Sequence, residues 1–185
     1  MADENFWKNA YESFWEKSSQ KEKLLRDIIF EKTSFELEPY GLGAESTEFI
    51  PGSAKKHSNE LGAPDFKVNG INVFVEVTGP LSNKARPESG LWIRPDKLNY
   101  AFTHRKKQEE FFVLLFDSVN KWYVIHANEE FFQDVKQKQK FFEQNDYIKI
   151  YPIIRGNKEC YISINHDNPF VKDLDYFISY LKKIK

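Results

Sequence analysis

Hydrophobic residues along this chain follow two spacings, one typical of helices and one typical of strands. In the first 32 residues they return every three or four positions, which predicts one or two helices, with Ser18-Ser19 as a break and a cap. Three later runs predict strands: 35–40, 111–116 and 122–126. The second of these runs is apolar throughout, as expected of a strand that is covered on both faces.

Later segments add helices and a hairpin. Pro95 suits a first helical turn, so a helix is predicted over 96–108, with Leu98, Ala101 and Phe102 on its apolar face. The remaining predicted elements are a helix at 129–142 capped by Asn128, a hairpin of 148–154 with 160–164, and a final helix that opens at Asn168-Pro169. Two segments are predicted as loops: 44–62 and 79–94. This order predicts an α/β fold in which helices flank a mixed β-sheet, with an extra C-terminal hairpin and helix.

The segment 62–79 predicts a β-hairpin. Its centre, Asn69-Gly70, is a strong signal for a two-residue turn, because a type I′ turn needs positive φ at both central positions. With that turn, Asp65 on the first strand lies opposite Phe74 on the second.

Alternation within this hairpin separates an acidic face from an apolar one. Successive side chains point to opposite sides of a strand, so one face carries Asp65, Phe74, Glu76 and Thr78. The other face carries Val73, Val75 and Val77, which can enter a core. Asp65 and Glu76 become diagonal neighbours, with Cα atoms roughly 7–8 Å apart. Two carboxylates at that spacing can converge on one hard divalent cation. The alternative is a solvent-exposed face that carries two acids by coincidence.

Pro64-Asp65, followed after ten residues by Glu76-Val77-Thr78, resembles the motif of the PD-(D/E)XK nuclease superfamily, which has the restriction-endonuclease-like fold. The resemblance covers about residues 20–125. It implies that Asp65, Glu76 and the backbone carbonyl of Val77 hold Mg²⁺ or Mn²⁺.

The same resemblance implies one more acidic residue, on the helix before the first strand. Glu22 suits that position because its helix leads into the strand at 35–40. Three other glutamates compete for the assignment: Glu12, Glu16 and Glu31.

The chain departs from this family at Thr78, where the family normally has Lys. That Lys polarises the attacking water and offsets negative charge in the transition state. Lys97, on the predicted helix 96–108, is the best substitute, and Lys84 is the other candidate. The viral cap-snatching endonucleases show a similar arrangement, with Lys on the next helix and an upstream His on the metal. His57 could take that role here.

Positive and negative charges nearly cancel over the whole chain, but they are distributed unevenly along it. The net charge is −1, so nucleic-acid binding requires a local basic patch. Residues 84–107 carry seven Lys and Arg against two acids, directly after the acidic pair. The residues predicted to contact a phosphate backbone are Lys55, Lys56, Lys84, Arg94, Arg105 and Lys106. The alternative is a solvated helix face.

Length and composition favour one globular domain over residues 1–185, with a core at about 20–125 and an extension at about 126–185. The single cysteine, Cys160, excludes a disulfide framework within one chain and fits a reducing, cytoplasmic location. No apolar run approaches the roughly 20 residues that span a bilayer, so no membrane partner is expected.

These observations predict a Mg²⁺-dependent endonuclease that hydrolyses phosphodiester bonds, with DNA favoured over RNA as the substrate and a homodimer as a plausible assembly. An RNA endonuclease on the same scaffold is favoured if His57 is a ligand. A catalytically silent nuclease fold that only binds is motivated by Thr78. A metal-free α/β protein is the remaining alternative.

Overall fold

A computed structural model of the chain describes residues 4–41, 62–79, 90–104, 109–116, 121–141, 147–154 and 157–184. The helices in this part of the chain are α1 (Glu4–Thr33), α3 (Pro95–His104), α4 (Glu129–Phe141) and α5 (Leu174–Ile184). The strands before α4 are β1 (Leu37–Pro39), β2 (Phe66–Val68), β3 (Val73–Thr78), β4 (Leu91–Ile93), β5 (Glu110–Phe116) and β6 (Trp122–His126). The strands after it are β7 (Tyr147–Ile150), β8 (Ile153–Ile154), β9 (Asn157–Lys158), β10 (Tyr161–Ile164) and β11 (Val171–Asp173).

The centre of the molecule is a six-stranded sheet with the order β1-β2-β3-β5-β6-β11. Strands β3 and β5 are parallel, and the other neighbours are antiparallel. Two parallel neighbours need a crossover connection, and α3 lies between them in the chain. The predicted mixed sheet flanked by helices is therefore confirmed.

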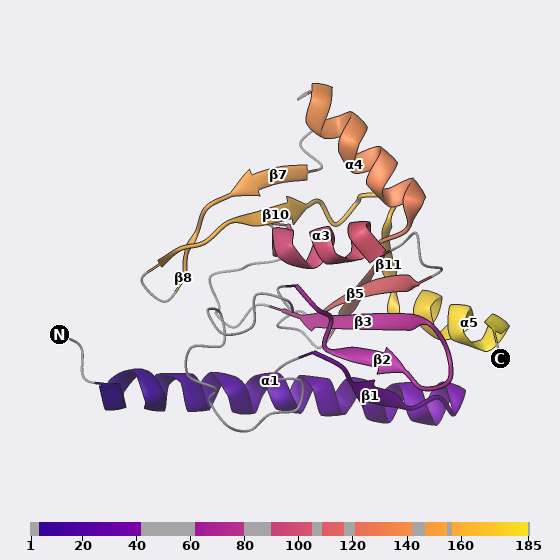
Figure 1. Ribbon diagram of the computed structural model, residues 1–185, viewed down its shortest axis with the longest axis horizontal. Coiled ribbons are helices and arrows are strands. Elements are labelled where there is room, and N and C mark those ends of the chain that lie inside the picture. Colours follow the sequence, from indigo (N-terminus) through magenta and orange to yellow (C-terminus); the bar gives the residue numbers. More distant parts are fainter. Residues whose placement is uncertain are drawn as a thin grey trace.

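The two faces of this sheet support separate hydrophobic clusters. Helices α1 and α5 cover one face, where Leu25, Ile29 and Phe177 pack with Val75 and other residues of the sheet. The opposite face carries α3, α4 and a smaller sheet of β4, β10 and β7. In Figure 1, α1 runs along the lower side of the molecule, and α3 and α4 lie on the upper side. The strand β5 is buried almost throughout because both faces are covered.

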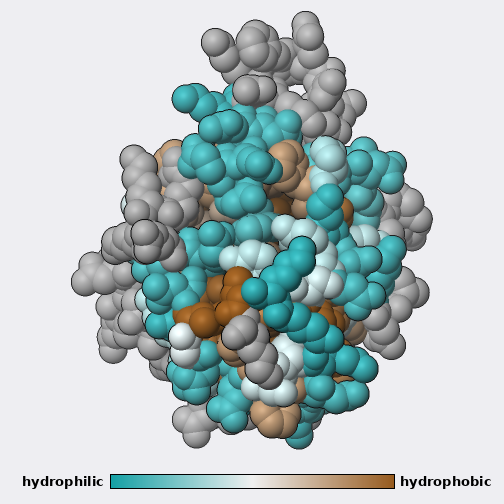
Figure 2. Space-filling model, turned by 90° about the vertical axis from the view of Figure 1, so that its right-hand side faces the viewer, coloured by the Kyte–Doolittle hydropathy of each residue, from teal (hydrophilic) through white to brown (hydrophobic). Residues whose placement is uncertain are grey.

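Helix α5 closes the core at the end of the molecule that lies on the right in Figure 1. Its Phe177 and Leu181 are fully buried, and Ile184 is 41% exposed. Figure 2 shows this end of the molecule, where hydrophilic side chains surround a central hydrophobic area. Among the described helices, none is both long enough and apolar enough to cross a membrane.

Three predicted elements differ in the structure. Helix α1 is continuous, so Ser18-Ser19 does not break it. The predicted loop 79–94 ends in strand β4, which pairs with β10 in the smaller sheet. The final helix begins at Leu174 rather than at Asn168, because Val171–Asp173 forms β11 against β6. Asp173 then caps the helix, since its Oδ1 accepts a hydrogen bond from Tyr176 N at 3.0 Å.

The predicted register of the β2–β3 hairpin is also wrong, by two residues. Phe66 pairs with Val75 and Lys67 with Phe74, so Asp65 falls opposite Glu76. The turn is not type I′, because only Gly70 of the Asn69-Gly70 pair has positive φ, at 79°. A shift of two residues leaves every side chain on its predicted face. Asp65 and Glu76 are therefore direct rather than diagonal neighbours.

Candidate active site

The backbone holds Asp65 in place at the entrance to β2. Its carbonyl accepts hydrogen bonds from Tyr40 N at 2.8 Å and from Gly41 N at 3.3 Å. Its side-chain Oδ2 accepts from Val77 N at 2.8 Å. A residue that pairs with an antiparallel neighbour directs its N–H and its C=O to the same side. Because the Val77 N–H points to Asp65, the Val77 carbonyl lies on the same side of β3, and its role as a third oxygen ligand stays a prediction.

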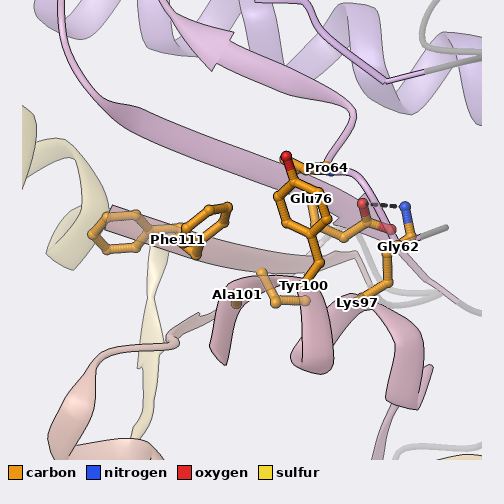
Figure 3. Close-up of a pocket in the computed structure, with 9 residues that line it drawn as sticks. Gly62, Pro64, Glu76, Lys97, Tyr100, Ala101 and Phe111 are labelled. Atoms are coloured by element: carbon orange, nitrogen blue, oxygen red, sulfur yellow. Dashed lines mark hydrogen bonds and ion pairs between the residues drawn. The ribbon is translucent and has the colours of Figure 1, made fainter. Parts of the chain in front are cut away.

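Helix α3 brings Lys97 to Glu76. The ammonium of Lys97 donates to Glu76 Oε2 at 2.7 Å and to the carbonyl of Ala63 at 2.8 Å. Figure 3 shows this ion pair, with Lys97, Tyr100 and Ala101 projecting from α3 towards β3 and β5. Both partners are shielded, with side chains only 16% and 11% exposed. Lys97 therefore reaches the acidic pair, as the substitution at Thr78 led us to expect.

A glycine permits this approach of α3. Gly62 has φ 84°, a conformation that favours glycine. A Cβ atom at this position would lie 2.2 Å from the carbonyl oxygen of Asp96. Only a residue without a side chain lets the segment before β2 run this close to the first turn of α3. The contact fixes Ala63 and Lys97 side by side.

The two carboxylates sit in an unfavourable electrostatic environment. Burial raises the pKa of Asp65, while Lys97 and the Val77 amide oppose that rise. Burial and the nearby charge of Asp65 raise the pKa of Glu76 well above its ordinary value, against the opposing effect of Lys97. Burial alone would lower the pKa of Lys97, but Glu76 and Asp65 outweigh it and raise that pKa. The lysine is therefore charged. Its single positive charge does not fully offset the negative charges of the two carboxylates.

A small cavity lies behind the ion pair. Its volume is about 10 Å³, roughly the room needed by one water molecule. Besides Glu76 and Lys97, its walls are mostly apolar and include Tyr100, Ala101 and Phe111 (Figure 3). These walls keep bulk water from the inner side of Glu76, which explains why burial is the largest influence on its pKa.

Two further cations lie beside the pair. Arg94 forms an ion pair with Asp96, with Nε 3.1 Å from Oδ1, and its side chain is 54% exposed. Burial would lower the pKa of Arg94, but Asp96 and Glu76 raise it, so this guanidinium is close enough to influence the site. Lys21, on α1, interacts electrostatically with Asp65 and was missed by the sequence reasoning, which singled out its neighbour Glu22. The signal for Lys21 was its place one turn before Leu25 on the face of α1 that packs on the sheet.

Among the residues that the structure describes, Asp65, Glu76 and the predicted third acid do not form a group of three acidic residues. Glu22 is buried on α1, next to Lys21. In the described part of the chain, no group of three or more His, Cys, Asp or Glu residues could hold a metal ion. Glu31, which competed with Glu22, is exposed and pairs with Lys32 at 3.3 Å. The side chains of Glu12 and Glu16 lie outside the described residues, as do His57, Lys55, Lys56, Lys84, Arg105 and Lys106.

Comparisons of this chain with protein-family models, with curated proteins and with solved structures gave no match. We therefore infer function from the geometry of the site. That geometry consists of two facing carboxylates, Asp65 and Glu76, with Lys97 bonded to one of them.

Proposed function

We propose that this protein is a Mg²⁺-dependent endonuclease that hydrolyses phosphodiester bonds in DNA, on a restriction-endonuclease-like scaffold. The observation that carries the proposal is the half-buried Asp65 facing the buried Glu76, with Lys97 at 2.7 Å from Glu76. Two acids placed together inside a protein destabilise it unless a cation joins them. A purely structural role would need only one acid for Lys97.

The donors at this point suit a hard divalent cation. Asp65, Glu76 and the Val77 carbonyl would offer oxygen atoms, which Mg²⁺ prefers, and water would complete its coordination. A cation there would keep both carboxylates ionised against the burial that raises their pKa values. When bound, Mg²⁺ supplies a water of lowered pKa and neutralises charge on the phosphate.

Lys97 supports an active enzyme rather than a silent one. An ammonium group has three N–H donors. Among the described residues, Glu76 and Ala63 accept two of them. The third donor can orient an attacking water or contact a phosphate oxygen, which is the role that Thr78 cannot fill. The RNA alternative depends on His57, which lies outside the described residues, so the cleavage assay has to separate DNA from RNA as the substrate.

The test compares wild type with Asp65→Asn and Glu76→Gln, which keep size and remove charge. Supercoiled plasmid and single-stranded RNA are incubated with each protein in Mg²⁺ or Mn²⁺, and in EDTA. Wild type should cut plasmid only with metal, and both variants should lose at least about a thousandfold in rate. Glu110→Gln, which removes a carboxylate outside the site, is the matched control and should cut normally.

Metal binding can be tested without turnover. Ca²⁺ and Mg²⁺ should raise the thermal midpoint of wild type and of Glu110→Gln, but not that of Glu76→Gln, because ligands that bind only the folded state stabilise it. Cutting of RNA alone would select the RNA endonuclease. If wild type neither binds metal nor cuts either polymer, the nuclease proposal is wrong.

A further inference from the structure

A second lysine, Lys21, interacts electrostatically with Asp65 from the opposite face of the sheet. Lys21 belongs to α1, whose Leu25 and Ile29 pack on the face lined by Val75 and Val77. Helix α3, which carries Lys97, packs on the other face through Leu98 and Ala101. The two lysines therefore approach Asp65 from two sides.

The ammonium of Lys21 lies over the end of β3. A Cβ atom added to Gly79, the residue after β3, would lie 3.4 Å from Lys21 Nζ. The same Cβ would lie 2.4 Å from the carbonyl oxygen of Phe116, so the chain leaves β3 tightly against the end of β5. Lys21 is thus close to the backbone that follows the Val77 carbonyl, at the edge where a substrate would meet Asp65.

Lys21 differs from Lys97 in its partners. Lys97 has two hydrogen-bond acceptors, one of them the carboxylate of Glu76. Within the described residues, Lys21 Nζ has no hydrogen bond or ion pair, although it is half-buried and interacts electrostatically with Glu22 and Asp65. Burial also lowers its pKa. A shielded ammonium without an acceptor is costly, and an incoming anion would offset that cost.

The surroundings of Lys21 indicate an anion as its ligand. Its ammonium is positive and lies beside the backbone that leaves β3, with the acids Glu22 and Asp65 as the charges that act on it. A divalent cation held by Asp65 and Glu76 would offset the charge of these two carboxylates, so a phosphodiester could approach Lys21 at this edge with less repulsion.

From this placement, and on the basis of the proposed function, we infer that Lys21 is a second phosphate-contacting residue. Its ammonium binds a non-bridging oxygen of the nucleic-acid backbone at the end of β3, on the side opposite Lys97. The contact is electrostatic and positions the backbone without reading base sequence. It does not require the metal, so it is present in EDTA.

The experiment measures binding of a fluorescein-labelled DNA duplex in EDTA over a series of salt concentrations. Each phosphate contact contributes about 0.9 to the slope of log K against log salt. Lys21→Met should lower the magnitude of that slope by about 0.9 and weaken affinity about fivefold to tenfold near 0.1 M salt. Lys21→Arg should restore both values, since it keeps the charge.

Lys23→Met is the matched control, because Lys23 is exposed on the same helix and loses the same charge. It should keep the wild-type slope. Lys21→Gln provides a second neutral variant if circular dichroism shows that Lys21→Met does not fold. Equal slopes for wild type and the neutral Lys21 variants, or an equal loss in Lys23→Met, would overturn the inference alone. A wild type that binds no nucleic acid would instead contradict the proposed function.

Discussion

Two polar clusters on the same sheet differ in how well their charges are satisfied. The site cluster (Asp65, Glu76 and Lys97) lies near the carboxyl end of β3. The latch cluster (Glu110, His126 and Tyr176) lies where β5 begins and β6 ends, and it joins α5 to the sheet. In the site cluster Lys97 of α3 contacts a carboxylate of the sheet directly, whereas in the latch cluster Tyr176 of α5 contacts His126, which in turn contacts Glu110.

In the latch cluster every group has a complementary partner. His126 Nε2 lies 2.6 Å from Glu110 Oε2, and Nδ1 lies 3.2 Å from the Tyr176 hydroxyl. An imidazole that donates from Nε2 accepts at Nδ1, so one tautomer satisfies both contacts. The ring also stacks on Phe112, with centroids 4.2 Å apart. This cluster can be explained by stability alone.

The site cluster cannot be explained in that way. Its two carboxylates face each other, and one lysine donates to only one of them. The raised pKa values of Asp65 and Glu76 indicate that the folded protein resists ionising both. Functional sites are where such unfavourable arrangements are retained. Variants of the two clusters should therefore separate activity from stability.

The largest loss of stability is expected for Lys97→Met, together with a loss of activity. Plasmid cleavage should fall about a hundredfold or more, because a positioned donor to the reaction is lost. The free energy of unfolding at neutral pH should fall by about 3 kcal/mol, since two buried acids lose their cation. Cleavage assays and urea unfolding measure the two effects. Lys172→Met, an exposed lysine on β11, is the control, and an identical response from both variants would remove Lys97 from the site.

His126→Ala should destabilise the protein without affecting cleavage. It removes two hydrogen bonds and the stacking on Phe112, which together contribute about 2–3 kcal/mol. Urea unfolding gives the loss of stability, and the plasmid assay at low temperature gives the rate for folded protein. A cleavage rate that fell as far as that of Lys97→Met would show that the two clusters are not separate.

Glu76→Gln should remove a pH dependence of stability that is opposite in sign to that of a carboxylate whose pKa is lowered on folding. The pKa of Glu76 is raised on folding, so its stabilising proton is bound at low pH and lost as pH rises through the folded-state pKa. Wild type in EDTA should therefore lose stability as the pH rises from the ordinary glutamate value of 4.5 through the raised folded-state pKa of Glu76. Glu76→Gln should lose less and be about 1–2 kcal/mol more stable than wild type at alkaline pH.

Thermal unfolding across pH, in EDTA, checks this expectation. Glu110→Gln is the control, because it removes a carboxylate that has a complementary partner. It should lower stability, whereas Glu76→Gln raises it. A lower midpoint for Glu76→Gln at alkaline pH would show that Lys97 compensates the acidic pair fully.

Much of the site cluster could be predicted from local patterns in the sequence. Alternation along Val73–Thr78 placed Glu76 on one face of β3 and the valines on the other, and the structure confirms both. Pro95 correctly marked the first turn of α3, which carries Lys97. The hairpin register was wrong because Asn69 does not adopt positive φ, yet a shift of two residues preserves the faces.

Features that depend on distant segments were not predictable. Strand β4 has three residues and pairs with β10, about seventy residues later. No local periodicity in the sequence therefore predicts it. Asn168 forms a turn rather than a helix cap, because Val171 joins β6 first. Lys21 approaches Asp65 only when α1 packs on the sheet; its helical spacing from Leu25 predicts the face of α1 that it shares, but not its proximity to Asp65.

The smallest effect is expected for Tyr176→Phe, which removes one hydroxyl from the latch cluster. Burial, with Glu110 and Glu130, raises the pKa of Tyr176, so the phenol stays protonated and can donate to His126. Its loss should cost about 1 kcal/mol in urea unfolding and leave cleavage unchanged. In His126→Ala the hydroxyl has already lost this partner, so adding Tyr176→Phe should cost much less. Equal costs in both backgrounds would show that Tyr176 stabilises α5 through packing, and that the latch cluster does not act as a unit.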